Sequence, residues 1–167
     1  MAEEIINRVA NSVLKTIDLE DFYPEGQRLV FDISPWLYEG LLLRENDFRD
    51  QVKMHDWSQY SGTYVAISCK TDAIIPSWAY LLLATKLQPV AAKVVVGDLE
   101  LLETLIFNDV LGEFDCTPYQ NMPVIIKGCA NRPIPQTGYL ILINKLLPVV
   151  RSLMYGEACS TVPLFKK

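Results

Sequence analysis

Two segments of the chain carry the same pattern of residues, displaced by 59 positions, and this repeat limits the folds that the sequence can adopt. The identical pairs at this spacing include Pro76/Pro135, Tyr80/Tyr139, Leu81/Leu140, Lys86/Lys145, Leu87/Leu146, Pro89/Pro148, Val90/Val149 and Gly97/Gly156. Each segment, over about residues 63–98 and 123–157, has the apolar periodicity of a strand, a helix and a second strand. Strands that alternate with helices pair in parallel, with right-handed crossovers. The repeat therefore predicts two equivalent strand–helix–strand halves of one sheet.

The remaining segments extend this α/β pattern. Ahead of the repeat, strands are expected at residues 13–19 and 29–33 and helices at about 34–43 and 46–55. From there on, strands are expected at 63–68, 93–96, 123–127 and 152–155, and helices at 76–87, 99–111 and 135–147. At 167 residues the chain is long enough for one well-buried domain. We expect a single domain over residues 1–167, with a mostly parallel, Rossmann-like sheet that is mixed at its N-terminal edge and flanked by helices.

The balance of charges excludes two classes of partner. The chain has 15 lysines and arginines against 20 aspartates and glutamates. No run of consecutive basic residues is longer than the C-terminal pair Lys166 and Lys167. A protein that binds a phosphate backbone or an anionic membrane surface needs a basic face. We therefore expect neither nucleic acid nor a membrane as a partner.

The N-terminus and the most apolar stretches indicate a cytoplasmic protein. Residues 1–4 are acidic, and no basic region followed by an apolar run indicates a signal peptide. The apolar stretches 78–84 and 138–150 are too short to cross a bilayer. In the cytoplasm the four cysteines are expected as thiols rather than as disulfides.

Three of the four cysteines come directly after expected strands. Cys69 follows strand 63–68 and Cys129 follows strand 123–127, and these strand ends align at a spacing of 60 that makes the two cysteines equivalent. Cys159 follows the last expected strand. Because parallel strands end at the same edge of a sheet, where ligands gather, we expect the three thiols to share one edge.

Three thiolates on one edge could hold a Zn²⁺ ion or an iron–sulfur cluster, with His55 or Asp98 as a fourth ligand. The sequence has no Cys-x-x-Cys pair, which is the spacing that makes metal motifs specific. The alternative is that the cysteines are small residues that pack at strand ends. Both interpretations stay open.

The loops after the strands also suit a reactive thiol or an anion. Cys69 and Cys129 lie a few residues before helix N-termini and beside basic residues, surroundings that favour the reactive thiolate form. The free backbone N–H groups of such loops bind anions. The candidate residues for an anion or ligand site are Lys70, Thr71, Asn131, Arg132 and Thr161. Neither loop has the glycine content of a phosphate-binding loop.

His55 is the only histidine and is followed by Asp56. A general base oriented by an aspartate is one interpretation, and a capping or packing role is the other. The side chains of adjacent residues rarely point toward each other, which favours packing. The carboxylates Asp18, Glu20 and Asp21 form either a divalent-ion site or a solvated turn.

Several blocks of the sequence resemble a known bacterial family. One of them is the motif His55-Asp56-Trp57-Ser58-Gln59-Tyr60, and the blocks together are residues 13–24, 55–60, 72–76, 78–80, 127–129 and 154–164. They are similar to the family catalogued as domain of unknown function 2480, and the resemblance extends over essentially the whole chain. Genes of this family tend to lie near iron–sulfur cluster assembly genes, so the resemblance implies an accessory role in that pathway. It supplies no catalytic residue.

Three functions are compatible with these observations. The first is a cytosolic accessory protein of iron–sulfur or sulfur metabolism that uses Cys69, Cys129 or Cys159 as metal ligand or sulfur carrier. The second is a non-catalytic interaction module or homo-oligomer with structural cysteines, in which apolar segments such as 162–165 bind a protein partner or a second copy. The third is an enzyme or binding protein that acts on a small anionic ligand at the strand ends.

Overall fold

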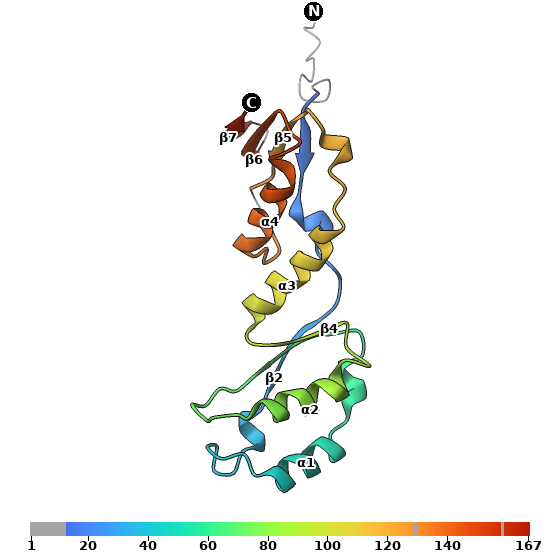
Figure 1. Ribbon diagram of the computed structural model, residues 1–167, viewed down its shortest axis with the longest axis vertical. Coiled ribbons are helices and arrows are strands. Elements are labelled where there is room, and N and C mark those ends of the chain that lie inside the picture. Colours follow the sequence, from blue (N-terminus) through green and yellow to red (C-terminus); the bar gives the residue numbers. More distant parts are fainter. Residues whose placement is uncertain (1–12, 129, 158) are drawn as a thin grey trace, which may run out of the picture. The chain divides into compact units, whose positions relative to one another are not determined.

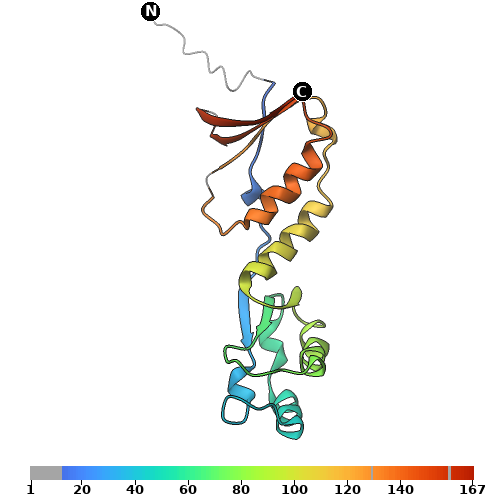
Figure 2. The same ribbon diagram turned by 60° about the vertical axis from the view of Figure 1, so that its left-hand side comes forward.

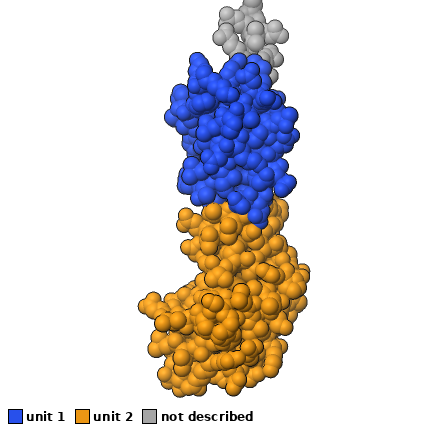
Figure 3. Space-filling model, in the orientation of Figure 1, with its two compact units in different colours: residues 1–23, 107–167 blue, residues 24–106 orange. Residues whose placement is uncertain are grey.

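The computed structural model describes residues 13–128, 130–157 and 159–167, and the chain forms two units. Unit 1 combines Met1–Tyr23 with Phe107–Lys167, and unit 2 is Pro24–Ile106 (Figure 3). Both units contain helices and mainly parallel strands, so the predicted α/β class is confirmed. The organisation of the whole chain as one domain stays a prediction.

Unit 2 is built on three parallel strands in the order β2-β3-β4 (Figure 1). Its elements are β2 (Arg28–Asp32), η2 (Ser34–Trp36), α1 (Glu45–Met54), η3 (Trp57–Tyr60), β3 (Tyr64–Ser68), α2 (Ser77–Leu87) and β4 (Lys93–Val96), where η marks a short 3₁₀ helix. Strands β2 and β3 alternate their side chains, so Phe31, Val65 and Ile67 are buried in one core with Phe48 of α1 and Leu83 of α2.

Unit 1 has a four-stranded sheet in the order β1-β5-β6-β7. Its elements are β1 (Lys15–Ile17), η1 (Leu19–Phe22), the C-terminal part of α3 (Leu99–Gly112), η4 (Thr117–Tyr119), β5 (Pro123–Ile126), α4 (Gln136–Leu146), β6 (Ser152–Glu157) and β7 (Ser160–Lys166). Helix α4 lies along the sheet (Figure 2), where its Leu142 and Leu146 are buried with Val124 and Ile126 of β5.

The strands form two sheets, so the prediction of one continuous sheet was wrong. β1 and β2 are consecutive in the chain, but β1 pairs with β5 and β2 pairs with β3. The apolar pattern of a strand shows that it will be buried but does not identify its neighbour. The segment around Pro24 and Gly26 separates the two strands, and each strand completes a different sheet.

The prediction of a mixed N-terminal edge was also wrong, because the antiparallel strand lies at the C-terminus. β7 pairs antiparallel with β6, from Glu157 opposite Ser160 to Ser152 opposite Lys166. Pro163 interrupts the strand pattern in this segment, since proline cannot donate a ladder hydrogen bond. An edge strand tolerates that loss, and β7 is such a strand.

The two units have corresponding elements at a constant displacement of 59 residues. Helices α2 and α4 have the same length, and the residues before them, Pro76 and Pro135, have nearly identical backbone angles. The aromatic contacts correspond as well: His55 stacks on Tyr60 with ring centroids 5.7 Å apart, and Phe114 stacks on Tyr119 at 5.5 Å. Further pairs at the same displacement are Phe48/Phe107, Asp56/Asp115, Gly62/Asn121 and Gly97/Gly156.

This register changes the equivalence predicted for the cysteines. The Gly62 N–H donates to the Val90 carbonyl and the Asn121 N–H donates to the Val149 carbonyl, so the residues before the two strands keep the displacement of 59, as do the helices after the loops. The spacing of 60 was therefore wrong, because both loops have the same length. Cys69 corresponds to Gly128.

Among the described helices, none combines the length and the hydrophobicity that crossing a bilayer requires.

Candidate functional site

The carboxyl ends of β1 and β5 bring together an aspartate and a lysine in unit 1. Ile17 lies opposite Ile126, so the residues that follow them, Asp18 and Lys127, are neighbours. Lys127 Nζ donates to Asp18 Oδ2 at 2.8 Å, and the Glu20 N–H donates to Asp18 Oδ1 at 2.9 Å. Both side chains are partly shielded, with 35% and 18% of their surfaces exposed. A charged pair thus occupies the edge where parallel sheets bind ligands.

The pKa values of this pair shift in opposite directions. Burial alone would raise the pKa of Asp18, but the hydrogen bonds from Lys127 and from the Glu20 backbone lower it below its ordinary value. The hydrogen bond to Asp18 raises the pKa of Lys127, and the charges of Asp18, Glu157 and Glu20 raise it further. Each group therefore holds the other in its charged form.

Glu20 of η1 ties the loop after β5 to the same edge. Its Oε1 accepts the backbone N–H groups of Asn131 and Arg132, the latter at 2.8 Å. The guanidinium of Arg132 lies 4.9 Å from the centre of the Tyr23 ring. The loop that was predicted to bind an anion is thus in contact with a carboxylate of the protein itself.

Unit 2 has an aspartate at the corresponding strand end. Asp32, the last residue of β2, accepts the Ser34 N–H at 3.0 Å, the Ser34 hydroxyl and the Lys70 N–H at 3.2 Å. The Lys70 ammonium is 3.6 Å from Asp32 Oδ2. Burial would raise the pKa of Asp32, but the hydrogen bonds and the Lys70 charge lower it. Thr71 Oγ1 lies 3.4 Å from the sulfur of Cys69 in the same loop.

Cys69 and Cys159 do not lie at the edge of one sheet, contrary to the prediction. Cys69 follows β3 in the sheet of unit 2, whereas Cys159 lies in the turn between β6 and β7 of unit 1. The prediction was wrong because it placed all the strands in one sheet. Cys129, which was expected to join them, lies outside the described residues.

The described thiols have different surroundings. Cys159 is exposed, and Cys69 is half-buried. Cys116 is half-buried, its Sγ lies 3.5 Å from the Lys145 carbonyl oxygen, and burial raises the pKa of its thiol. The charge of Lys145 opposes this rise. Cys159 is thus the most accessible of the three described cysteines.

Within the described ranges, no three His, Cys, Asp or Glu side chains form a group suited to a metal ion. Asp98, one candidate ligand, accepts the Leu101 N–H at 2.8 Å and so caps the first turn of α3. Thr161, one of the anion-site candidates, places its hydroxyl 3.8 Å from the Met154 sulfur.

His55, the other candidate ligand, lies among aromatic rings. Its ring centroid is 4.7 Å from that of Trp57, and the rings of Phe31 and Trp36 are 5.6 and 5.2 Å away. Its Nε2 lies 3.0 Å from the Tyr60 hydroxyl. Burial lowers the pKa of His55, and the charge of Asp56 opposes this only in part. The surroundings therefore favour the neutral imidazole.

We expect the stability of the protein to fall as the pH drops below about 6.5. The pKa of His55 is lower in the folded chain than its ordinary value of 6.5, so the unfolded chain binds a proton more readily, and stability rises with pH across this window. His55→Phe, which introduces the residue found at the corresponding position, Phe114, should remove this pH dependence. Urea unfolding between pH 7.5 and 5 checks it, and an equal slope in both proteins would contradict it.

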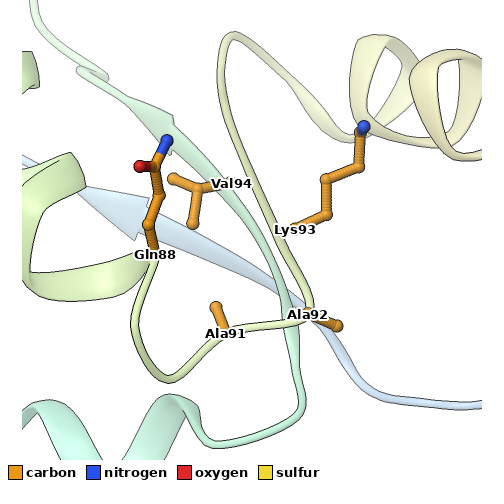
Figure 4. A pocket seen from close by; sticks show the side chains of 5 residues that line it. All are labelled: Gln88, Ala91, Ala92, Lys93 and Val94. Carbon is orange, nitrogen blue, oxygen red and sulfur yellow. The ribbon is translucent and has the colours of Figure 1, made fainter.

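A pocket of about 270 Å³ lies in unit 2, lined by Gln88, Ala91, Ala92, Lys93 and Val94 (Figure 4). It is formed by the turn from α2 into β4. This turn precedes β4, so the pocket lies at the amino end of that strand, and none of the candidate site residues that the structure describes lines it.

Sequence reasoning missed the role of Lys127 and Asp32, although a signal was present. Asp18 and Asp32 both follow an apolar residue at the end of a short strand, and both are followed by an apolar residue and a polar one. A second missed signal is Asp-x-Ser/Thr-x-Tyr at 56–60 and 115–119, where each aspartate accepts the N–H two residues later. These short caps fall between the stronger apolar patterns.

No curated protein and no solved structure matches the chain. A family model described as "Protein of unknown function (DUF2480)" matches residues 3–167, which confirms the resemblance noted in the sequence.

Proposed function

The chain belongs to the DUF2480 family, and from this premise we propose that it is an accessory protein of sulfur or iron–sulfur metabolism that presents thiols at the strand ends of unit 1. The observation that carries the proposal is the exposure of Cys159 in the turn after β6. A sulfur carrier or a transient metal ligand needs a thiol that a partner can reach.

The position of Cys159 in the sheet supports a pair of thiols rather than a set of three. β5 and β6 are adjacent parallel strands, and Cys129 and Cys159 follow them by three and two residues in the chain. Lys127, at the end of β5, supplies a positive charge on the same edge. Thiols that follow adjacent strands at an edge with a cation suit sulfur transfer or metal binding with further ligands from a partner. The cytoplasmic location that such thiols require is part of the proposal.

We expect Cys159 to react with iodoacetamide in the native protein much faster than Cys116, because Cys159 is exposed and Cys116 is half-buried with a carbonyl oxygen near its sulfur. Mass spectrometry of the alkylated peptides measures both rates. Iron, zinc and bound sulfide, measured after anaerobic purification, should be lost from Cys159→Ser and Cys129→Ser and kept in the control Cys116→Ser. Equal alkylation rates, together with no metal and no bound sulfur in the native protein, would contradict the proposal.

A protein partner or a homo-oligomer is the second candidate, and β7 is the observation that favours it. β7 is an edge strand, and its Val162 and Leu164 are 60% and 48% exposed. Exposed apolar side chains on a sheet edge suit pairing with another chain. The molecular mass of the protein in solution tests this candidate.

A further inference from the structure

The loop between β5 and α4 directs two successive backbone N–H groups at one oxygen atom. The N–H groups of Asn131 and Arg132 both donate to Oε1 of Glu20. Successive N–H groups that converge in this way bind oxyanions in many proteins. The loop lies beyond the carboxyl ends of β1 and β5, where ligands of parallel sheets bind.

Two cations accompany these N–H groups. Lys127 lies within electrostatic range of the Glu20 carboxylate while it donates to Asp18. The guanidinium of Arg132 lies over the Tyr23 ring, at the end of η1. The Glu20 carboxylate thus has two backbone donors and lies within range of the Lys127 charge, and the loop itself carries a second cation, Arg132, as oxyanion sites often do.

Unit 2 shows that the fold does not need a carboxylate at this position. Asp18 and Asp32 lie at the ends of the corresponding strands β1 and β2, so Glu20 corresponds to Ser34. Ser34 begins the short helix η2 with its hydroxyl directed to Asp32. The same strand–turn–3₁₀ arrangement thus forms with a serine, and the carboxylate of Glu20 is specific to the loop of unit 1.

We propose that Asn131 and Arg132 form a binding site for the carboxylate or phosphate group of a small ligand, and that Glu20 occupies this site until the ligand displaces it. The inference goes beyond the proposed function because it requires no cysteine. The ligand replaces one oxyanion by another, so the N–H groups stay paired in both states. Glu20 is then a competitor that sets the affinity of the site.

Titration with inorganic phosphate tests the proposal, with backbone amide NMR signals of Asn131 and Arg132 as the readout. Glu20→Ala should bind phosphate roughly tenfold or more tightly than the native protein, with the largest shifts at these two amides. Glu20→Gln, which keeps a weaker acceptor, should give an intermediate affinity. The matched control is Ser34→Ala, the corresponding change in unit 2, which should leave the phosphate affinity unchanged. Acetate in place of phosphate distinguishes a site for carboxylates in general from one for phosphate.

Arg132→Ala in the Glu20→Ala background should weaken phosphate binding again, because it removes the nearby charge. If neither Glu20 variant binds phosphate more tightly than the native protein, or if the shifts fall on other residues, Glu20 is a structural tether and the proposal is wrong. Alkylation of Cys159 is measured separately, so failure here leaves the thiol proposal intact.

Discussion

Arg28→Met is expected to lower the free energy of unfolding by roughly 3–5 kcal/mol, the typical loss when one partner of a buried ion pair is replaced and the other stays buried. Arg28 Nε lies 2.7 Å from Glu103 Oε1, and only 11% and 9% of the two side chains are exposed. The guanidinium also donates to the carbonyl oxygens of Pro24 and Gly26, at 2.7 and 2.6 Å, and lies 4.6 Å from the Tyr64 ring centre. The variant keeps the aliphatic stem but leaves the Glu103 carboxylate buried without this counter-charge.

Urea unfolding at pH 7 measures the loss, and a double variant separates its causes. Arg28→Met combined with Glu103→Leu removes both charges, and replacement of a whole buried pair by apolar residues is often nearly neutral. The double variant should therefore recover much of the stability. If the single variant loses less than about 1 kcal/mol, the value typical of an exposed pair, the ion pair is not a buried one in solution.

Gly156→Ala is expected to lower the free energy of unfolding by roughly 1–3 kcal/mol or more, because the backbone conformation at this position is disfavoured for residues with a side chain. Gly156 has φ of +124°, a region that residues with a side chain rarely adopt. A Cβ atom there would lie 2.5 Å from the Ser160 carbonyl oxygen. Because that oxygen belongs to the backbone of β7, the hairpin that carries Cys159 would have to shift.

Two other glycines serve as controls for this prediction. Gly112 has open space around its Cα and no positive φ, so Gly112→Ala should be neutral or stabilising. Gly97 corresponds to Gly156 and has φ of +149°, but a Cβ there meets the end of the flexible Leu101 side chain at 2.6 Å. Gly97→Ala should therefore cost less than Gly156→Ala. Thermal unfolding ranks the three variants, and equal stability of the Gly156 and Gly112 variants would contradict the prediction.

The helices and strands of the repeat could be predicted from the sequence because their signals are local. The prolines at 76 and 135 mark helix starts, and the buried positions 79, 83 and 87 recur on one face of α2 at helical spacing. The partners of β1 and β2 could not be predicted. β1 has only three residues, one of them apolar, and its partner β5 lies more than a hundred residues later, so a single sequence does not identify this pairing.

For the candidate site, too, only the features with local sequence signals could be predicted. Strand ends could be located, so Lys70, Asn131 and Arg132 were correctly placed in strand-end loops. The grouping of cysteines from different units followed from the assumption of one sheet, and it failed with that assumption. The contact between Glu20 and the Asn131 N–H joins residues 111 positions apart. Such a contact depends on the fold as a whole.

The pairing of β1 with β5 has a consequence for how the chain folds during synthesis. All of unit 2 comes from one continuous stretch, Pro24–Ile106, so its contacts can form while the ribosome is still adding residues. β1 is made before that stretch, but its partner lies 109 residues later, at Lys15 opposite Val124. We expect the N-terminal strand to wait in an unpaired state until unit 2 is complete. During that interval Ile17 and the backbone of β1 wait for their partner strand, and once β5 has been made, β1 adds to it as the edge strand of the unit 1 sheet.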